Sequence, residues 1–515
     1  MPANAFDAVI VGSGFGGAVT ACRLAEAGYG VLVLERGRRW DPTTFPRKPG
    51  DPWLWDHAHP ELENGWLDLR VFPHMAIAAG CGVGGGSLVY ANVSIDARRN
   101  TFEAGWPPEI TYDALEPHYR DVDEMLQSRP LPNGQWTERT RLVKLAAERA
   151  GAGERFRLLD LAVSFDEDWS YRLPDPHSTS HSKPFTNAHG KQQGTCVHLG
   201  NCDIGCDVNA RNTLDLNYLA RAESRGAEIR PLHLVRGIAP AAGGYRVSFD
   251  RIEDGELVPG EVIGRLVILA AGSLGSTEIL LRCRDELRTL PELSAFLGRN
   301  WSSNGDFLTP AIHPPLPGVR SGRLVNPTRG PTITAAVDFL DSSPREPQFF
   351  IEDGGFPDVA EEYLRGLAAE DSRHAVVQAL IRTVRFVLSS PGLHDHVMPW
   401  FAQGRDAADG VLSLRGGKLF LDWDVAKSEE VIEAILRTHE RFAVLTGGIP
   451  FEPLTWKLSR ALITPHPLGG CNMGRAPADG VVDHKGEVFG HRNLYVADGA
   501  IVPEAIGLNP SKTIA

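Results

Sequence analysis

A glycine-rich turn near the start of the chain limits the possible folds more than any other feature. The segment "FDAVIVGSGFGGAVTACRLAEAGYGVLVLERG" reads as a strand, a turn, a helix and a second strand, and Gly12, Gly14 and Gly17 give the spacing G-x-G-x-x-G. The first glycine permits a tight turn, the second lets the backbone approach a pyrophosphate, and the third lets helix and strand pack closely. The helix would direct unpaired N–H groups at the phosphates, and Glu35, which ends the second strand, can accept hydrogen bonds from ribose hydroxyls. Glycines also recur in turns for steric reasons alone, but the complete pattern predicts a dinucleotide-binding domain.

The far end of the chain favours FAD over NAD as the dinucleotide. "NLYVADGAIVPEAIGLNPSKTIA" reads as a short strand, then Asp498 and Gly499, then a turn into a helix near Pro510. Asp498 at the end of a strand can reach a ribityl hydroxyl, and the helix can direct its N-terminus at a flavin ring. "RLVILAAGSLGSTEILLRC" is another strand, small-residue turn and helix, and the glycines between Gly80 and Gly86 leave room for a cofactor.

Length and charge narrow the class of protein. A chain of 515 residues can bury the cores of two domains. Its formal charge of −13 argues against a nucleic-acid partner, which needs basic patches. No stretch of about 18 uninterrupted apolar residues predicts a transmembrane helix. A first strand from Phe6 leaves no room for an export signal, and the seven cysteines are an odd number, so we expect reduced thiols and a cytoplasmic protein.

Three cysteines lie close together in "CVHLGNCDIGC". Cys196, Cys202 and Cys206, with His198 between them, are four residues of types that bind zinc. Their spacing matches neither a zinc ribbon nor an iron–sulfur run of four cysteines. We therefore expect no metal and interpret the segment as a glycine-punctuated loop with buried thiols.

The assembled motifs resemble the glucose-methanol-choline (GMC) family of FAD oxidoreductases, and most closely its bacterial cholesterol-oxidase branch. The motifs that carry the resemblance are "GSGFGG", "GVGGGSLV", "NARNTLDLNYLARA", "ILAAGSLGSTEIL", "HPLGGCNMG" and "NLYVADGAIVPEAIGLNPSKTI", which span nearly the whole chain. The resemblance implies an α/β fold, with a discontinuous Rossmann-type FAD-binding domain and an α+β substrate-binding domain that has an antiparallel sheet. The FAD-binding domain would comprise residues 1–45, 75–100, 190–300 and 465–515. The substrate-binding domain would comprise residues 46–74, 101–189 and 301–464.

Local patterns agree with these elements. "GGYRVSFDRIEDGELVPGEVIGRLVIL" reads as strands joined by turns, and "GVLSLRGGKLFLDWD" alternates like a hairpin. "DSRHAVVQALIRTVRFVLSS" predicts an amphipathic helix that Pro391 closes.

A histidine and an asparagine are the first two catalytic candidates. Oxidising an alcohol by hydride transfer requires a group that accepts the hydroxyl proton, and the imidazole of His466 in "TPHPLGGCNMG" suits this task. Asn509, just before Pro510, offers an amide that can bond the substrate oxygen. From the residues alone, a structural histidine and an asparagine in a turn or helix cap are the simpler interpretations. The resemblance implies catalytic roles, because the family has His at the first position and His or Asn at the second.

Glu352 in "QFFIEDGGFP" is the third catalytic candidate. Its apolar neighbours could desolvate the carboxyl, raise its pKa and make it a proton shuttle. In cholesterol oxidases an acid in a similar apolar strand moves a proton during a double-bond isomerisation. The neighbouring Asp353 competes for this role, and a solvent-facing acid at the end of a strand is an equally good interpretation.

The cofactor is expected to be held without a covalent bond. The family often has Asn-Gly after "GGGSLV", whereas this chain has Tyr90 and Ala91, and no histidine in the stretch could attach the flavin. Seventeen residues form the predicted FAD site: Gly12, Gly14, Phe15, Gly16, Gly17, Glu35, Gly85, Gly86, Ser87, Tyr90, Asn92, Val235, Ala271, Gly272, Asp498, Gly499 and Asn509.

These observations predict an FAD-dependent oxidoreductase that oxidises the CH–OH group of a bulky apolar alcohol, such as a sterol or hydroxysteroid. Oxygen or another acceptor would reoxidise the flavin. Three alternatives stay open: a dehydrogenase for a non-steroid alcohol or sugar, a flavin photodecarboxylase-like lyase, and a flavoprotein that serves only as a redox partner or scaffold. The oligomeric state is not predicted.

Overall fold

A mixed sheet joins strands from the two ends and the middle of the chain. The computed structural model describes residues 5–48, 50–314, 324–343, 345–358 and 394–515. In the mixed sheet, the order is β10 (Glu228–Arg230), β2 (Val31–Leu34), β1 (Ala5–Val11), β13 (Glu256–Leu269), β12 (Gly244–Glu253) and β11 (His233–Ala241). The strand β22 (Leu494–Val496) runs parallel to the end of β13. Because β1, β13 and β22 are neighbours, the Rossmann-type part of the fold is discontinuous in sequence, as predicted.

Both faces of β1 are buried, which explains its unbroken apolar sequence. Ala8 and Ile10 pack with the helices α1 (Phe15–Glu26) and α4 (Tyr218–Ser224). Val9 and Val11 point to the opposite face, where α5 (Gly272–Leu281) packs. The predicted turn–helix units after β1 and β13 are therefore confirmed.

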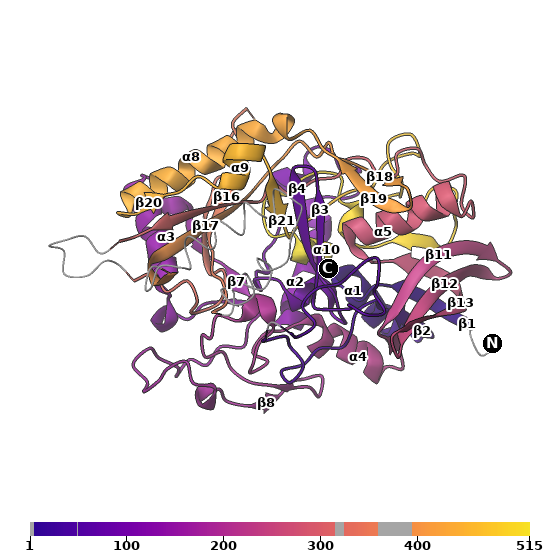
Figure 1. Ribbon diagram of the computed structural model, residues 1–515, viewed down its shortest axis with the longest axis horizontal. Helices are drawn as coiled ribbons and strands as arrows, with labels where there is room; N and C mark the ends of the chain where they lie inside the picture. The colour runs from indigo at the N-terminus through magenta and orange to yellow at the C-terminus, as the bar shows by residue number, and fades with distance from the viewer. Residues whose placement is uncertain (1–4, 49, 315–323, 344, 359–393) are drawn as a thin grey trace.

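The antiparallel sheet supplies the other half of the molecule. Its order is β20 (Ile449–Pro450), β14 (Phe307–Ile312), β17 (Val397–Gly404), β16 (Phe349–Asp353), β15 (Ala335–Asp338) and β6 (Phe156–Leu158). One face packs on the helices α3 (Glu138–Arg149) and α8 (Glu429–Leu445). Figure 1 shows this sheet beneath α8, at the opposite end of the molecule from the mixed sheet.

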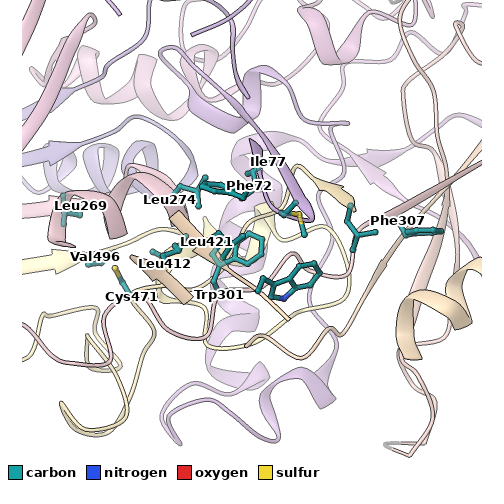
Figure 2. Packing of buried hydrophobic residues seen from close by; sticks show 14 of the residues in the cluster. Phe72, Ile77, Leu269, Leu274, Trp301, Phe307, Leu412, Leu421, Cys471 and Val496 are labelled. Atoms are coloured by element: carbon teal, nitrogen blue, oxygen red, sulfur yellow. The ribbon is translucent and has the colours of Figure 1, made fainter. Parts of the chain in front are cut away.

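An apolar core links the two sheets. Figure 2 shows it running from Leu269 and Val496 of the mixed sheet, past Trp301, to Phe307 of the antiparallel sheet. The predicted hairpin, β18 (Val411–Arg415) and β19 (Lys418–Asp422), contributes Leu412 and Leu421 to this core. Strands and helices therefore belong to one packed body, and the exact domain boundaries stay a prediction.

The remaining elements are shorter or connect the two halves. A small sheet joins β21 (Leu462–Thr464), β4 (Met75–Gly80) and β3 (Leu67–Phe72), and the terminal helix α10 (Ser511–Ile514) packs between α1 and α2 (Tyr112–Leu126), as Figure 1 shows. The others are α9 (Leu454–Ser459), β5 (Arg129–Pro130), β7 (Asp160–Leu161), β8 (Phe185–Thr186) and β9 (Gln192–Gln193). The helix expected over residues 371–390 lies outside the described residues. None of the helices within the described ranges is long and apolar enough to cross a bilayer.

A buried ion pair ties α3 to the antiparallel sheet. Arg139 and Asp353 are both fully buried, and Nη1 of Arg139 lies 2.8 Å from Oδ2 of Asp353. The guanidinium also donates to the carbonyl oxygens of Thr332, Pro331 and Arg329. Asp353 accepts from the N–H groups of Thr334 and Ala335 as well. The pair therefore fixes residues 329–335 against the end of β16.

We predict that Arg139→Met lowers the free energy of unfolding by about 3–5 kcal/mol, because it leaves the Asp353 carboxylate buried without its counter-charge. Arg139→Met combined with Asp353→Leu should recover part of this loss. Arg141→Met on the same helix is the matched control, since Arg141 and Glu138 form an exposed pair worth about 1 kcal/mol or less. Urea denaturation measures all four proteins, and equal losses for Arg139→Met and Arg141→Met would contradict the prediction.

Candidate active site

One cavity of about 910 Å³ brings together segments from along the whole chain. This volume is at the upper end of the range for ligand sites. The predicted site residues that line it are Gly12, Gly14, Phe15, Gly16, Glu35, Gly85, Gly86, Tyr90, Val235, Ala271, Gly272, His466, Asp498, Gly499 and Asn509. The sequence pattern thus identified residues from the N-terminal turn to the last helix that share one cavity.

The start of α1 can hold a pyrophosphate. Gly14 caps this helix without a side-chain hydrogen bond, and no acidic residue lies in its first turn, so the first N–H groups are available to an anion. A Cβ at Gly16 would overlap the carbonyl oxygen of Ala497, which is why only glycine fits there. A Cβ at Gly86 or Gly272 would instead meet no protein atom within 4 Å. The backbone therefore leaves open space where a dinucleotide needs it.

Two predicted carboxylates lie at separate points of this cavity. Glu35 accepts hydrogen bonds from the N–H and hydroxyl of Ser13, at 3.1 and 2.7 Å, and from the N–H of Gly37 at 2.9 Å. Asp498 accepts from the N–H groups of Gly272 and Ala500, at 2.8 and 2.7 Å. Burial raises the pKa of Asp498 to about 6. Asp498 thus ties the end of β22 to the start of α5 beside the cavity.

Three predicted cofactor residues do not line the cavity. A Cβ at Gly17 would overlap the carbonyl oxygen of Gly12, so this glycine serves close packing within the turn. Ser87 donates to the Gly84 carbonyl oxygen at 2.7 Å, and Oδ1 of Asn92 accepts from Nε of Arg211 at 2.6 Å. These contacts shape the wall of the cavity from behind.

The sequence motifs gave no role to Arg211, yet this residue organises the loop that carries Tyr90. Arg211 is buried, and its guanidinium donates to the carbonyl oxygens of Leu88 (2.7 Å), Ser87 (2.5 Å) and Tyr90 (3.1 Å). The guanidinium also lies 5.4 Å from the centre of the Tyr90 ring. Tyr90 in turn meets Phe15 edge to face at 5.5 Å. An arginine within the motif "NARNTLD" was the only available signal.

His466 is held by an aspartate that the sequence analysis missed. Nδ1 of His466 lies 2.9 and 3.0 Å from the two carboxylate oxygens of Asp306, which is fully buried. The backbone N–H of His466 donates to Oγ1 of Thr464 at 2.8 Å. An ionised carboxylate only accepts hydrogen bonds, so its contact favours a proton on Nδ1, which would leave the lone pair of Nε2 free. His466 lines the cavity and can therefore accept a proton there.

Asn509 lies between the cavity and Glu352. Nδ2 of Asn509 is 3.5 Å from Oε2 of Glu352, and its Oδ1 has no hydrogen-bond partner among the described residues. Oε2 of Glu352 also accepts from Nε2 of Gln403 at 2.9 Å. Glu352 is fully buried and does not line the cavity itself. Burial, with the nearby Asp353 and Asp306, raises the pKa of Glu352 to about 8.

Successive side chains of β16 point to opposite faces of the sheet, which separates the two candidates for the proton shuttle. Glu352 pairs with Phe401 across the sheet, and Phe401 and Leu308 line the cavity from the same face. Asp353 points to the other face, toward Arg139. Of the two acids, Glu352 is therefore the one beside Asn509.

The three clustered cysteines do not line the cavity that His466 lines. Cys196, Cys202 and Cys206 are free thiols, and within the described parts of the chain no group of three or more metal-binding side chains is placed to hold an ion. His198 stacks on Trp169 with ring centres 4.0 Å apart, and burial lowers its pKa to about 3. His198 is therefore part of the interior, whereas the three thiols, which were expected to be buried, are only half-buried.

Comparisons with known proteins show which family and fold this chain resembles. A family model described as GMC oxidoreductase matches residues 418–515, and one described as NAD(P)-binding Rossmann-like domain matches residues 10–41. A cholesterol oxidase of Mycobacterium tuberculosis is 30% identical over 99% of this chain and 89% of its own length. One of Acinetobacter baumannii is 29% identical over 99% of this chain and 92% of its own. The crystal structure of pyridoxine 4-oxidase from Mesorbium loti, 17% identical, has the same fold with a TM-score of 0.61 over 99% of this chain and 96% of that one.

We predict that Glu352→Gln changes how stability depends on pH. Between about pH 4.5 and 8 the folded protein retains a proton on Glu352 that the unfolded chain has lost, so the parent loses stability as the pH rises through this window. One such group contributes a slope of about 1.4 kcal/mol per pH unit, which glutamine removes while it can still accept from Gln403.

Urea denaturation at pH 5, 6.5 and 8 measures this effect. The variant should gain stability relative to the parent as the pH rises. Glu430→Gln, at an exposed position of α8, is the control and should follow the parent. A constant difference between Glu352→Gln and the parent at all three pH values would rule out the raised pKa.

Proposed function

This chain belongs to the GMC oxidoreductase family, and we propose that it oxidises the CH–OH group of a bulky, largely apolar alcohol, such as a sterol or hydroxysteroid, to a ketone. It is an alcohol-oxidising flavoenzyme. One observation carries the proposal for the site: His466, with Nδ1 bonded to Asp306, lines the same cavity as the N-terminal glycine turn. A side chain that can accept a proton therefore lines the same cavity as the expected dinucleotide site.

The residues of the cavity fit FAD bound without a covalent link. The N–H groups at the start of α1 would hold the pyrophosphate, Glu35 the ribose hydroxyls, and Asp498 the ribityl chain. FAD, when bound, supplies a hydride acceptor at N5. The protein has to bind the alcohol, orient its oxygen and remove its proton.

His466 removes the proton from the hydroxyl group of the substrate. Its Nε2 lone pair accepts the hydroxyl proton, and the Nδ1–H···Asp306 hydrogen bond stabilises the positive charge that then develops on the ring. Asn509 bonds the substrate oxygen through its amide and fixes the carbinol in place. Glu352, with a pKa of about 8, holds a proton at neutral pH, and its Oε2 accepts from Nδ2 of Asn509, so this contact orients the amide that bonds the substrate oxygen.

The substrate class is inferred from the apolar walls of the cavity that His466 lines. Leu308, Phe401, Ile333 and Val93 line the cavity and present apolar side chains. Such walls stabilise an apolar skeleton through burial. The cholesterol-oxidase relatives support a sterol-like skeleton, and oxygen or another acceptor takes the electrons from the reduced enzyme.

We predict that a sterol or hydroxysteroid bleaches the flavin absorbance of the holoenzyme in the absence of oxygen. Sterols, terpenols, aryl alcohols and sugars should be screened by stopped flow. His466→Gln should slow bleaching about 10²- to 10⁴-fold, because it removes the base. His118→Gln, on the exposed side of α2, is the control and should bleach at the parent's rate.

Two outcomes would overturn the proposed function. One is His466→Gln bleaching as fast as the parent. The other is bleaching that needs blue light and a fatty acid and occurs with no alcohol, which would indicate the lyase.

A further prediction concerns the cofactor link. Acid precipitation of the purified holoenzyme should release all flavin into the supernatant, since the stretch that follows "GGGSLV" contains no histidine that could attach it. Absorbance and mass spectrometry of both fractions measure this. Flavin retained on the precipitated chain would contradict non-covalent binding.

A further inference from the structure

A buried turn, Ser302–Asp306, contacts His466 and the backbone just before Asn509, and we call it the positioning turn. We propose that the positioning turn sets the geometry of the active site: Asp306 selects which ring nitrogen of His466 faces the substrate, and Asn304 fixes the loop that carries Asn509. The inference rests on the proposed function and adds residues that neither touch the substrate nor were predicted from the sequence.

The contact with His466 has two anchors. Both oxygens of Asp306 lie within 3.0 Å of Nδ1, so the ring is held in its plane as well as in distance. The hydroxyl of Thr464 bonds Oδ2 of Asp306 and also accepts the backbone N–H of His466. The side chain and the backbone of His466 are therefore tied to one carboxylate.

The contact with Asn509 runs through the backbone. Nδ2 of Asn304 donates to the carbonyl oxygen of Leu508 at 2.8 Å, and its Oδ1 accepts from the N–H of Gly507 at 2.8 Å. Asn304 has φ of 57°, a left-handed conformation that asparagine tolerates better than most residues. A side chain two residues from Asp306 therefore fixes the backbone just before Asn509.

The positioning turn is itself locked in place. Asp406 accepts from Oγ of Ser302 at 2.7 Å and from the N–H and Oγ of Ser303, both at 2.8 Å. Ser302 and Leu468 exchange two backbone hydrogen bonds of 3.0 Å, which joins the turn to the segment of His466. Ser302, Ser303, Asn304 and Asp306 are fully buried. A turn held this firmly can transmit its geometry to the groups it contacts.

The carboxylate of Asp306 affects the site through its charge as well as through its geometry. Burial raises the pKa of Asp306, whereas His466 beside it lowers that pKa. Asp406 is a further buried acid near Asp306, and Asp306 in turn acts on the pKa of Glu352. Removal of the Asp306 charge therefore takes away the carboxylate that lies beside a positive charge on the ring of His466.

The first test reads the ring directly and needs no alcohol. Histidine is labelled with ¹⁵N in the holoenzyme, and the signal of His466 is assigned by its loss in His466→Gln. We expect the parent's neutral ring to be protonated on Nδ1, and Asp306→Ala to shift the ring toward protonation on Nε2. A parent ring protonated on Nε2, or a ring that Asp306→Ala leaves unchanged, would overturn the inference even if every alcohol reduces the flavin. Absence of bleaching by any alcohol would overturn only the proposed function.

The second test uses kinetics to separate the role of Asp306 from that of Asn304. Asp306→Asn should lower the rate of anaerobic flavin reduction about 10- to 100-fold with little change in KM, and should move the acid limb of the pH profile to lower pH. Asn304→Ala should lower the rate without moving that limb. The matched control is Asp338→Asn. Asp338 is a buried aspartate of β15 that pairs with Arg98 and Arg157, so this substitution should affect stability alone. An unmoved limb in Asp306→Asn, or the same shift in Asp338→Asn, would refute the role of Asp306.

Discussion

The close contact between the N-terminal turn and the C-terminal strand is the constraint on which the rest of the site depends. β13 pairs in parallel with β1 and also with β22, so segments almost 500 residues apart in sequence become neighbours. Gly16 lies directly against the Ala497 carbonyl, where no side chain fits. This contact places Asp498 and the start of α1 on one cavity. The residues that follow Asp498 in the sequence lead to Asn509, and the residues that precede it lead back to His466.

The antiparallel sheet completes the site through its two-residue period. One face of β16 carries Asp353 toward α3, where Arg139 neutralises it. The other carries Glu352 toward Asn509 and the cavity, where burial without a cation raises its pKa. Burial raises the pKa of both acids, but the pleat places Asp353 beside a guanidinium that counteracts this rise and Glu352 beside amides that carry no charge.

Local sequence patterns were sufficient for the elements that form locally. The strand–turn–helix units at Gly12 and Ala271 and the hairpin of β18 and β19 follow from period, glycine placement and turn residues. The partners of the site residues were beyond such patterns. Asp306 lies 160 residues from His466, and "SSNGDF" reads only as a loop that enters a strand. Choosing between Glu352 and Asp353 required knowledge of which face of β16 meets α3, which no single strand reveals.

Arg211 has a consequence for the order in which the molecule assembles. Its guanidinium reaches carbonyl oxygens that lie 121 to 124 residues earlier, in the loop of Ser87–Tyr90. Contacts of such long range form late, because the chain entropy of closing the loop is lost before any contact compensates for it. A chain synthesised only as far as this loop lacks both Arg211 and β13, the parallel partner of β1. The wall around Tyr90 is therefore complete only after Arg211, from the middle of the chain, has reached this loop.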